Sequence, residues 1–276
     1  MNIEALNRKM FSDAAKYLNT SRKGFGEEYS AFIRNNTNLK EGARVLDVGC
    51  GLGFLAKTIE KFMKSLEIHG IDCSPELIEK AKEDSTIQFT TGDIYNLPYP
   101  ESFFDLTICQ TLFIHLANPE CALGEMVRVT KPSGQIIAIE PIIHTDGLDR
   151  FVPGEASIKV EERKKLTAFD IEKKKEGGID MFIARKLPYL FLSKGLSDVK
   201  VSAHTFVFLA LDESINDQKQ ESLEQINFSS YEMMMLQLGY PKDKLEKLLY
   251  YEKKFANVPG ELSLTTLLLI NGEKSA

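Results

Sequence analysis

The sequence contains no hydrophobic run long enough to cross a membrane. Among its 276 residues, no apolar stretch approaches the length of about 18 residues that a membrane-spanning helix needs. The N-terminus also lacks the apolar core of a secretory signal peptide. We therefore expect a cytoplasmic protein with no membrane partner.

Basic residues are outnumbered by acidic residues. Lys and Arg total 34 residues against 40 Asp and Glu, which gives a formal net charge of −6. A protein that binds nucleic acid gains much of its affinity by releasing counterions from phosphates, and this requires a basic surface. The acidic balance therefore disfavours DNA or RNA as a substrate or partner.

Cysteine and histidine are scarce, at four residues each, and they form no recognisable site pattern. No two cysteines have the Cys-x-x-Cys spacing of zinc sites and redox motifs. We expect the thiols to be reduced, as is usual in the cytosol. The histidines and aspartates are scattered along the chain, so we predict no metal centre.

The most informative feature that the sequence does contain is the segment Val45–Gly53. An apolar run with an embedded acid leads into three glycines at alternate positions, and an amphipathic segment follows. Glycine permits a positive φ and lets a ligand approach where a Cβ atom would collide. The pattern predicts a strand, a tight turn and a helix, with a ligand beside the turn. An ordinary strand-to-helix turn is the alternative.

Two further acids stand at the ends of predicted strands. Asp72 ends the strand Ile68–Asp72, where a carboxylate can accept hydrogen bonds from two ribose hydroxyls. Asp93 follows the strand at residues 87–90 and could bind an adenine amino group, with Ile94 beside the ring. Together these residues favour a nucleoside-like ligand.

Two other residues argue against a dinucleotide. The dinucleotide pattern has a glycine three residues after Gly51, where this chain has Phe54. Asp47 lies inside the first strand, where it would repel a phosphate but suit an ammonium group. The ligand that these residues describe has an adenosine part, an amino-acid part and no phosphate. S-adenosylmethionine has this composition, and NAD does not.

With these motifs the sequence resembles the class I S-adenosylmethionine-dependent methyltransferases of the small-molecule type, similar to methyltransferase domains 11 and 25. The resemblance runs from about Gly42 to Pro141 and includes the segments Phe104–Gln110 and Met126–Gln135. It implies an α/β fold: a Rossmann-like, doubly wound, seven-stranded, mostly parallel sheet with an antiparallel last strand and helical lid insertions. It also implies S-adenosylmethionine as cofactor and in-line transfer of its methyl group to a small organic acceptor.

The predicted cofactor site combines the glycine loop, the two strand-end acids with their neighbours, and the end of the fourth strand. Two N-terminal residues are also included, although packing of an N-terminal cap is the alternative for them. The predicted cofactor-binding residues are Tyr17, Arg22, Asp47, Gly49, Cys50, Gly51, Gly53, Asp72, Cys73, Gly92, Asp93, Ile94 and Gln110.

We expect one composite domain in which two long insertions interrupt the alternation of strands and helices. Because ligands of open α/β sheets bind beyond the carboxyl ends of the strands, we predict that both insertions are substrate lids. The expected parts are a helical cap (1–40), the cofactor-binding core (41–141), a first lid (142–180), the continued core (181–210), a second helical insertion (211–259) and the last strand (260–276).

Three element boundaries follow from local signals in the second half of the chain. Periodicity predicts a helix from about Ile179 to Lys194. The apolar run Gln135–Glu140 predicts the fifth strand. The last strand is expected over Leu262–Ile270, terminated by the dipeptide Asn271-Gly272.

Few side chains are candidates for the chemistry of the reaction. His115 follows the fourth strand, on the loop that faces the methyl group in the resembling family, and could act as a base; a loop-anchoring role is the alternative. His144 follows the fifth strand and could reach the acceptor, or could be an exposed lid residue. Arg185 could bind an acidic substrate, although a surface ion pair is the simpler interpretation.

The absence of two motifs narrows the class of methyl acceptor. No Asn/Asp-Pro-Pro-Tyr segment follows the fourth strand, as it does in amino-group nucleic-acid methyltransferases, and no paired-glutamate loop resembles that of protein arginine methyltransferases. A small organic acceptor is therefore expected. The alternative is a regulatory protein that binds S-adenosylmethionine or S-adenosylhomocysteine without catalysis. The acceptor atom and the oligomeric state are not predicted.

Overall fold

The structure is a computed structural model that describes most of the chain. The described residues are 26–63, 65–83, 85–143, 150–151, 157–209, 235–246 and 262–275. Three residues of the predicted site, Tyr17, Arg22 and His144, lie outside these ranges.

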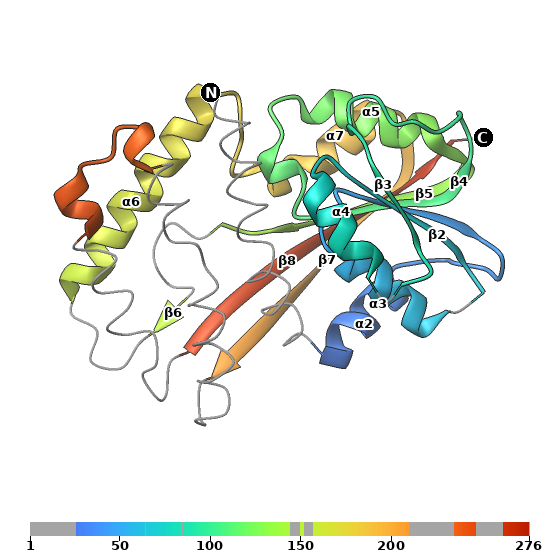
Figure 1. Ribbon diagram of the computed structural model, residues 1–276, viewed down its shortest axis with the longest axis horizontal. Helices are drawn as coiled ribbons and strands as arrows, with labels where there is room; N and C mark the ends of the chain where they lie inside the picture. Colours follow the sequence, from blue (N-terminus) through green and yellow to red (C-terminus); the bar gives the residue numbers. More distant parts are fainter. Residues whose placement is uncertain are drawn as a thin grey trace.

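The core is one mixed sheet with helices on both faces (Figure 1). Seven long strands follow the order β3-β2-β1-β4-β5-β8-β7, and the two-residue β6 pairs with the far end of β8. Strands β1 to β5 are mutually parallel, whereas β8 is antiparallel to both β5 and β7. The predicted fold class is confirmed. The strands are β1 (Arg44–Val48), β2 (Glu67–Asp72), β3 (Gln88–Thr91), β4 (Phe104–Gln110), β5 (Thr130–Pro141), β6 (Arg150–Phe151), β7 (Leu196–Leu209) and β8 (Leu262–Lys274).

Helices cover the sheet as two separate layers. The described α-helices are α2 (Gly26–Asn35), α3 (Phe54–Phe62), α4 (Pro75–Lys82), α5 (Pro119–Val129), α6 (Ser157–Glu176) and α7 (Leu187–Ser193), with the short 3₁₀ helices η1 (Phe113–His115) and η2 (Ile183–Arg185). Among the described residues, no helix combines the length and the apolar character that a membrane crossing would need.

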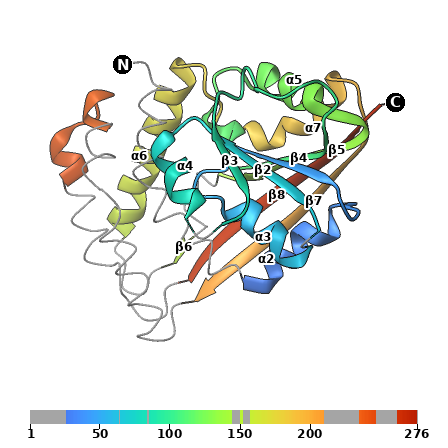
Figure 2. The same cartoon turned by 45° about the vertical axis from the view of Figure 1, so that its right-hand side comes forward.

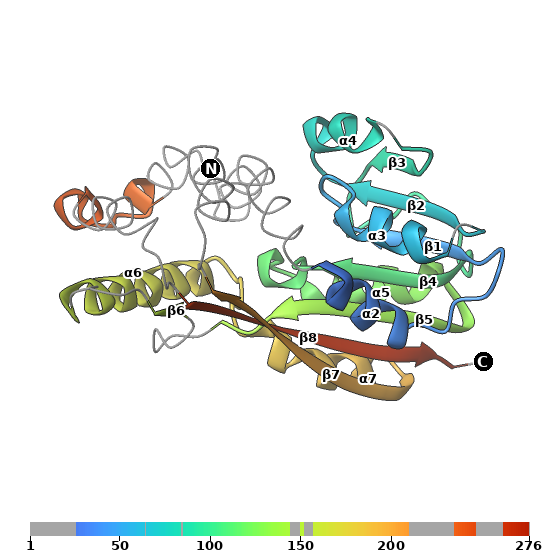
Figure 3. The same ribbon diagram turned by 90° about the horizontal axis from the view of Figure 1, so that it is seen from below.

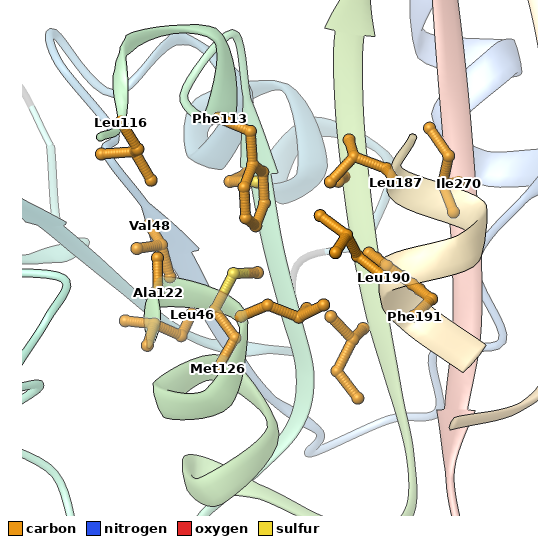
Figure 4. Packing of buried hydrophobic residues seen from close by; sticks show 14 of the residues in the cluster. Leu46, Val48, Phe113, Leu116, Ala122, Met126, Leu187, Leu190, Phe191 and Ile270 are labelled. Carbon is orange, nitrogen blue, oxygen red and sulfur yellow. The ribbon is translucent and has the colours of Figure 1, made fainter. Parts of the chain in front are cut away.

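Two hydrophobic clusters, one on each face, hold these layers to the sheet. Side chains alternate between the faces along a strand. Val45 belongs to a cluster with buried residues of α2, α3 and α4, while Leu46 and Val48 belong to a cluster with buried residues of α5 and α7. Figure 4 shows the second cluster, in which Phe113 of η1 and Phe191 of α7 also take part. Burial of both faces explains why the parallel strands are continuous apolar runs.

Three predicted element boundaries were wrong. Instead of one helix over 179–194, η2 is followed by a separate helix, α7. Pro188 lies in the first turn of α7, and proline is tolerated there because that turn has no intrahelical use for its N–H. Strand β8 continues through Asn271-Gly272. At Gly272 a Cβ atom would lie 2.9 Å from a ring carbon of Phe191, so this glycine allows close packing rather than ending the strand. The fifth strand is also longer than expected, because β5 begins at Thr130.

The described parts of the two insertions pack against each other. α6 lies in the first insertion, and the residues at 235–246 lie in the second; Figures 1 and 2 show them side by side. Their shared cluster includes Leu166, Met235 and Leu245, and the rings of Phe169 and Tyr240 are 5.0 Å apart. Figure 3 shows α6 beyond the carboxyl ends of β4 and β5. That the insertions act as lids stays a prediction.

Candidate cofactor site

The loop between β1 and α3 is the tight glycine turn that the sequence predicts. Gly49, Gly51 and Gly53 all have positive φ, at 68°, 54° and 78°. The loop is fixed to the neighbouring strand because the N–H groups of Gly49 and Cys50 both donate to the carbonyl of Ile71, at 2.8 and 3.0 Å. The backbone therefore runs across the carboxyl end of β2.

The three glycines serve different purposes. A Cβ atom at Gly49 would lie 2.8 Å from Cδ1 of Leu112, and one at Gly53 would lie 2.5 Å from Cζ of Phe89. These two glycines allow close packing within the protein. At Gly51 a Cβ atom would meet none of the described residues within 4 Å. Gly51 therefore borders open space, and this is where a ligand can approach the loop.

Asp47 is buried beneath the loop, with 1% of its surface exposed. Its Oδ2 accepts a hydrogen bond from the N–H of Ala56 at 3.0 Å, in the first turn of α3. That N–H is one of the donors that a helix start leaves without an intrahelical partner. Asp47 thus ties β1 to the start of α3, and its predicted contact with a ligand ammonium group stays a prediction.

Asp72 connects the loops on its two sides. Its Oδ2 accepts from the N–H of Gly51 and its Oδ1 from the N–H of Ser74, both at 2.9 Å. Burial raises the pKa of Asp72, against the lowering effect of these hydrogen bonds. Cys73, the next residue, is exposed. The carboxylate therefore sets the position of the glycine loop directly.

The loop after β3 lies against the same strand end. The N–H of Gly92 donates to the carbonyl of Asp72 at 2.9 Å, and a Cβ atom at Gly92 would lie 2.5 Å from Cδ1 of Ile71. Asp93 accepts from the N–H of Tyr95 at 3.0 Å, and Ile94 packs against the core. The structure thus brings together the predicted residues of the first three βα loops.

The end of β4 is held by α2. Gln110 is buried, and its Oε1 accepts a hydrogen bond of 2.7 Å from the hydroxyl of Tyr29. Tyr29 itself is buried and packs beside Phe54, with ring centroids 5.5 Å apart. The sequence analysis did not assign Tyr29 to the site. A contact between residues 81 positions apart leaves no local signal.

The loop after β4 is held by Glu140, which the sequence analysis did not assign to the site. Glu140 has 0% of its surface exposed. Its Oε1 accepts from the N–H groups of Leu112 and Phe113, at 2.7 and 2.8 Å. The available signal was an acid at the end of the otherwise apolar run that forms β5. Such a side chain must be hydrogen-bonded when it is buried.

The two remaining candidates lie on short 3₁₀ helices that contact each other. His115 ends η1, and its two ring nitrogens have no solvent-exposed surface. Arg185 ends η2 and is exposed, with its guanidinium 5.8 Å from the ring centroid of Phe182. The roles predicted for His115 and Arg185 stay predictions.

The interior of the site is electronegative. Burial raises the pKa of Cys109 well above its usual value, and the nearby carboxylates of Glu140 and Asp47 raise it further. The pKa of Cys50 is raised in the same way, first by burial and then by Asp47 and Asp72. All four cysteines are free thiols. Among the described residues, no group of His, Cys, Asp and Glu side chains could hold a metal ion.

A sheet of this order, with a glycine loop after β1 and an acid at the end of β2, defines the class I methyltransferase fold. The model of a methyltransferase-domain family matches residues 39–186, which is more than half of the chain. The chain belongs to this family, the class I S-adenosylmethionine-dependent methyltransferases, and its cofactor is S-adenosylmethionine.

Individual relatives match part of the chain. An uncharacterized methyltransferase of Schizosaccharomyces pombe is 36% identical over 114 residues, which are 37% of this chain and 41% of that protein. Ajmaline N-methyltransferase of Rauvolfia serpentina is 34% identical over 134 residues, 46% of this chain and 44% of that enzyme. The matches thus span less than half of the length of these relatives.

A solved structure matches more of the chain. Phosphoethanolamine N-methyltransferase 2 of Haemonchus contortus, in complex with S-adenosyl-L-methionine, has a TM-score of 0.53 at 14% sequence identity. The match covers 91% of this chain and 53% of that one. At this identity the likeness shows the fold alone.

Proposed function

We propose that this protein transfers the methyl group of S-adenosylmethionine to a small organic acceptor. The observation that carries the proposal is the arrangement of three carboxylates, the buried Asp47 and Glu140 and the half-buried Asp72, around a glycine loop that borders open space at Gly51. Carboxylates in a low-dielectric site favour a cationic ligand and disfavour a phosphate. S-adenosylmethionine carries positive charge and no phosphate, so the donor set fits it.

In this proposal each residue of the site contacts a different part of the cofactor. Asp72 would hold the ribose hydroxyls, because each carboxylate oxygen can accept a hydrogen bond beyond the one from the backbone. Asp93 would take the adenine amino group, with Ile94 against the ring, and Asp47 the ammonium group. When bound, the cofactor supplies a methyl group on a sulfonium, which is a good leaving group. Alignment by the protein can then provide much of the rate.

For an acceptor that must lose a proton, we propose His115 as the general base. It stands on the loop after β4, and the backbone N–H groups of Leu112 and Phe113 on that loop are held by Glu140. An imidazole accepts a proton near neutral pH, as this step requires. In a His115→Ala variant we expect the rate of methyl transfer to fall by about 10²-fold or more, with cofactor affinity maintained.

The acceptor class is supported by sequence and by a relative. Ajmaline N-methyltransferase acts on a small molecule, as its name says, and this chain lacks the motifs of the macromolecular classes. We also propose that the protein acts in the cytoplasm, since all four of its cysteines are free.

Titration calorimetry with S-adenosylmethionine, S-adenosylhomocysteine and NAD is the first test. We expect the first two to bind and NAD to give no signal; NAD binding at micromolar strength without an S-adenosylmethionine signal would contradict the assignment. Mass spectrometry then follows conversion to S-adenosylhomocysteine in the presence of small amine, hydroxyl and thiol acceptors. Binding without any turnover across such a panel would favour the alternative, a regulatory protein that binds the cofactor.

A further inference from the structure

The loop after β4 adopts a backbone that its own sequence does not favour. Thr111 has a φ of 53°, in the left-handed region that β-branched residues rarely occupy. Its N–H donates to the carbonyl of Ile139 at 2.8 Å. Such a conformation persists only where surrounding contacts impose it, and residues of this kind cluster at functional sites.

Glu140 supplies those contacts. One oxygen of its buried carboxylate accepts from two consecutive N–H groups, those of Leu112 and Phe113, directly after Thr111. The ring of Phe113 is fixed in the hydrophobic cluster shown in Figure 4. The loop is therefore fastened at two neighbouring residues, by charge at the backbone and by packing at the side chain.

The fastened loop touches the cofactor loop. Cδ1 of Leu112 lies where it would be 2.8 Å from a Cβ atom at Gly49, so the Leu112 side chain rests directly on the glycine turn. Gly49 and Gly51 belong to the same turn, and Gly51 borders the open space. A contact chain thus runs from Glu140 on β5, through Leu112, to the backbone that faces the ligand.

We propose that Glu140 is a positioning residue for cofactor binding and for His115. Its carboxylate holds the loop at 111–115 so that Leu112 supports the glycine turn and His115 is presented on the same side. The inference rests on the proposed function in naming S-adenosylhomocysteine as the probe and in taking His115 as the base. If Glu140 only stabilised the fold, substitutions there would lower the thermal midpoint without changing the affinity for the probe.

The test compares three substitutions at Glu140 with a control at the other end of the sheet. Glu140→Ala removes the acceptor, Glu140→Asp shortens it by one methylene, and Glu140→Gln keeps an acceptor oxygen without charge. The control is Asp105→Ala, because Asp105 also accepts from a backbone N–H, that of Arg44 at 2.9 Å, but at the amino end of β4. For each variant the Kd for S-adenosylhomocysteine, the thermal midpoint and amide hydrogen exchange are measured.

We expect the Kd of Glu140→Ala and Glu140→Asp to rise by about tenfold or more, because the two backbone donors lose their acceptor in the first variant and an acceptor within reach in the second. Glu140→Gln should stay within about threefold of the wild type, since an amide oxygen can accept both bonds. Exchange should accelerate at Leu112 and Phe113 in Glu140→Ala and at Arg44 in the control, whose Kd should not change.

Several outcomes would overturn the proposal. Glu140→Ala binding within about twofold of the wild type, or Asp105→Ala weakening binding equally, would show that Glu140 affects only stability. Failure of Glu140→Gln to rescue binding would show that the charge matters and the loop geometry does not. If the wild type itself does not bind the probe, it is the proposed function that fails.

A second variant decides the matter if Glu140→Ala does not fold. Leu112→Ala leaves the carboxylate and its two hydrogen bonds intact but removes the side chain that rests on Gly49. We expect a folded protein with a Kd for S-adenosylhomocysteine that is raised by about threefold or more. An unchanged Kd would show that the contact between Leu112 and Gly49 does not affect cofactor binding, and it would overturn the proposal.

Discussion

The two ends of the sheet use the same kind of side chain in different ways. At the amino ends, Asp105 is paired with the ammonium group of Lys131 at 2.8 Å, and Glu67 with the guanidinium of Arg44 at 3.0 Å. At the carboxyl ends, Asp72 and Glu140 accept hydrogen bonds from the backbone N–H groups of loops.

The acids at the amino ends contribute to stability, whereas those at the carboxyl ends fix the loops of the candidate site. An ion pair between flexible, half-exposed side chains contributes little and imposes little geometry. A carboxylate that accepts two backbone N–H groups fixes the course of a loop and leaves its negative charge beside it. The carboxyl end of this sheet is therefore a shaped, electronegative surface, whereas the amino end is a neutralised one.

The sharpest test of this contrast concerns two glycines of the same turn. We expect Gly51→Val to abolish detectable binding of S-adenosylhomocysteine in a folded protein, because the added side chain enters the open space beside the turn. The φ of 54° there costs a β-branched residue such as valine at least about 1–2 kcal/mol, so the thermal midpoint of Gly51→Val is measured beside its affinity. Gly53→Ala is the comparison: its Cβ atom would meet Phe89 at 2.5 Å, so it should lower the thermal midpoint more than Gly51→Ala does. Normal affinity in Gly51→Val would make the loop an ordinary turn.

Removal of the Asp72 carboxylate should have the next largest effect. Asp72→Ala takes away the acceptor of the Gly51 and Ser74 N–H groups and of the proposed ribose contacts. At about 1.5–3 kcal/mol for each charged hydrogen bond, we expect calorimetry to show affinity reduced by about hundredfold or more. Asp105→Ala serves as control and should bind normally. Equal affinity of Asp72→Ala and the wild type would mean that Asp72 only terminates its strand.

The hydroxyl of Tyr29 offers a smaller and cleaner change. Tyr29→Phe keeps the buried ring but removes the donor to Gln110. We expect a loss of about 1 kcal/mol in unfolding free energy, measured by urea denaturation, and a few-fold weaker affinity for S-adenosylhomocysteine. If affinity falls while stability does not, the hydrogen bond orients Gln110 for binding alone; if neither changes, α2 has no influence on the site.

The smallest effect concerns acid stability at the amino end. Burial acts to raise the pKa of Asp105, but the hydrogen bonds from Lys131 and Arg44 outweigh it, and the pKa is lowered from its usual value. A lowered pKa contributes stability above the pKa of the unfolded chain, and this is lost as pH falls through the folded value. We expect Asp105→Asn to be less stable than the wild type by up to about 1 kcal/mol at pH 7, with a gap that closes below about pH 4. A gap that is constant with pH would refute an electrostatic origin.

The sequence predicted what is local. The positive φ values of Gly49, Gly51 and Gly53 follow from their spacing, and the position of Asp72 follows from the apolar strand before it. The fold class followed from the family resemblance that these motifs carry. The contacts of Tyr29 with Gln110 and of Glu140 with Leu112 join segments that only tertiary packing brings together. α6 was expected only as an insertion, because its sequence is largely charged and has little amphipathic pattern.

The pairing of β7 with β8 has a consequence for how the second insertion can be exchanged. The register places Leu209 opposite Leu262, so the chain leaves the sheet and returns to it at adjacent points. A segment of another length can be inserted between those residues at an entropic cost that grows only slowly with length. A replacement must also keep the packing against α6 that Met235 and Leu245 of the second insertion provide. Figure 3 shows the end of β7 and the start of β8 on the same side as α6, so a new segment would lie beside the first insertion.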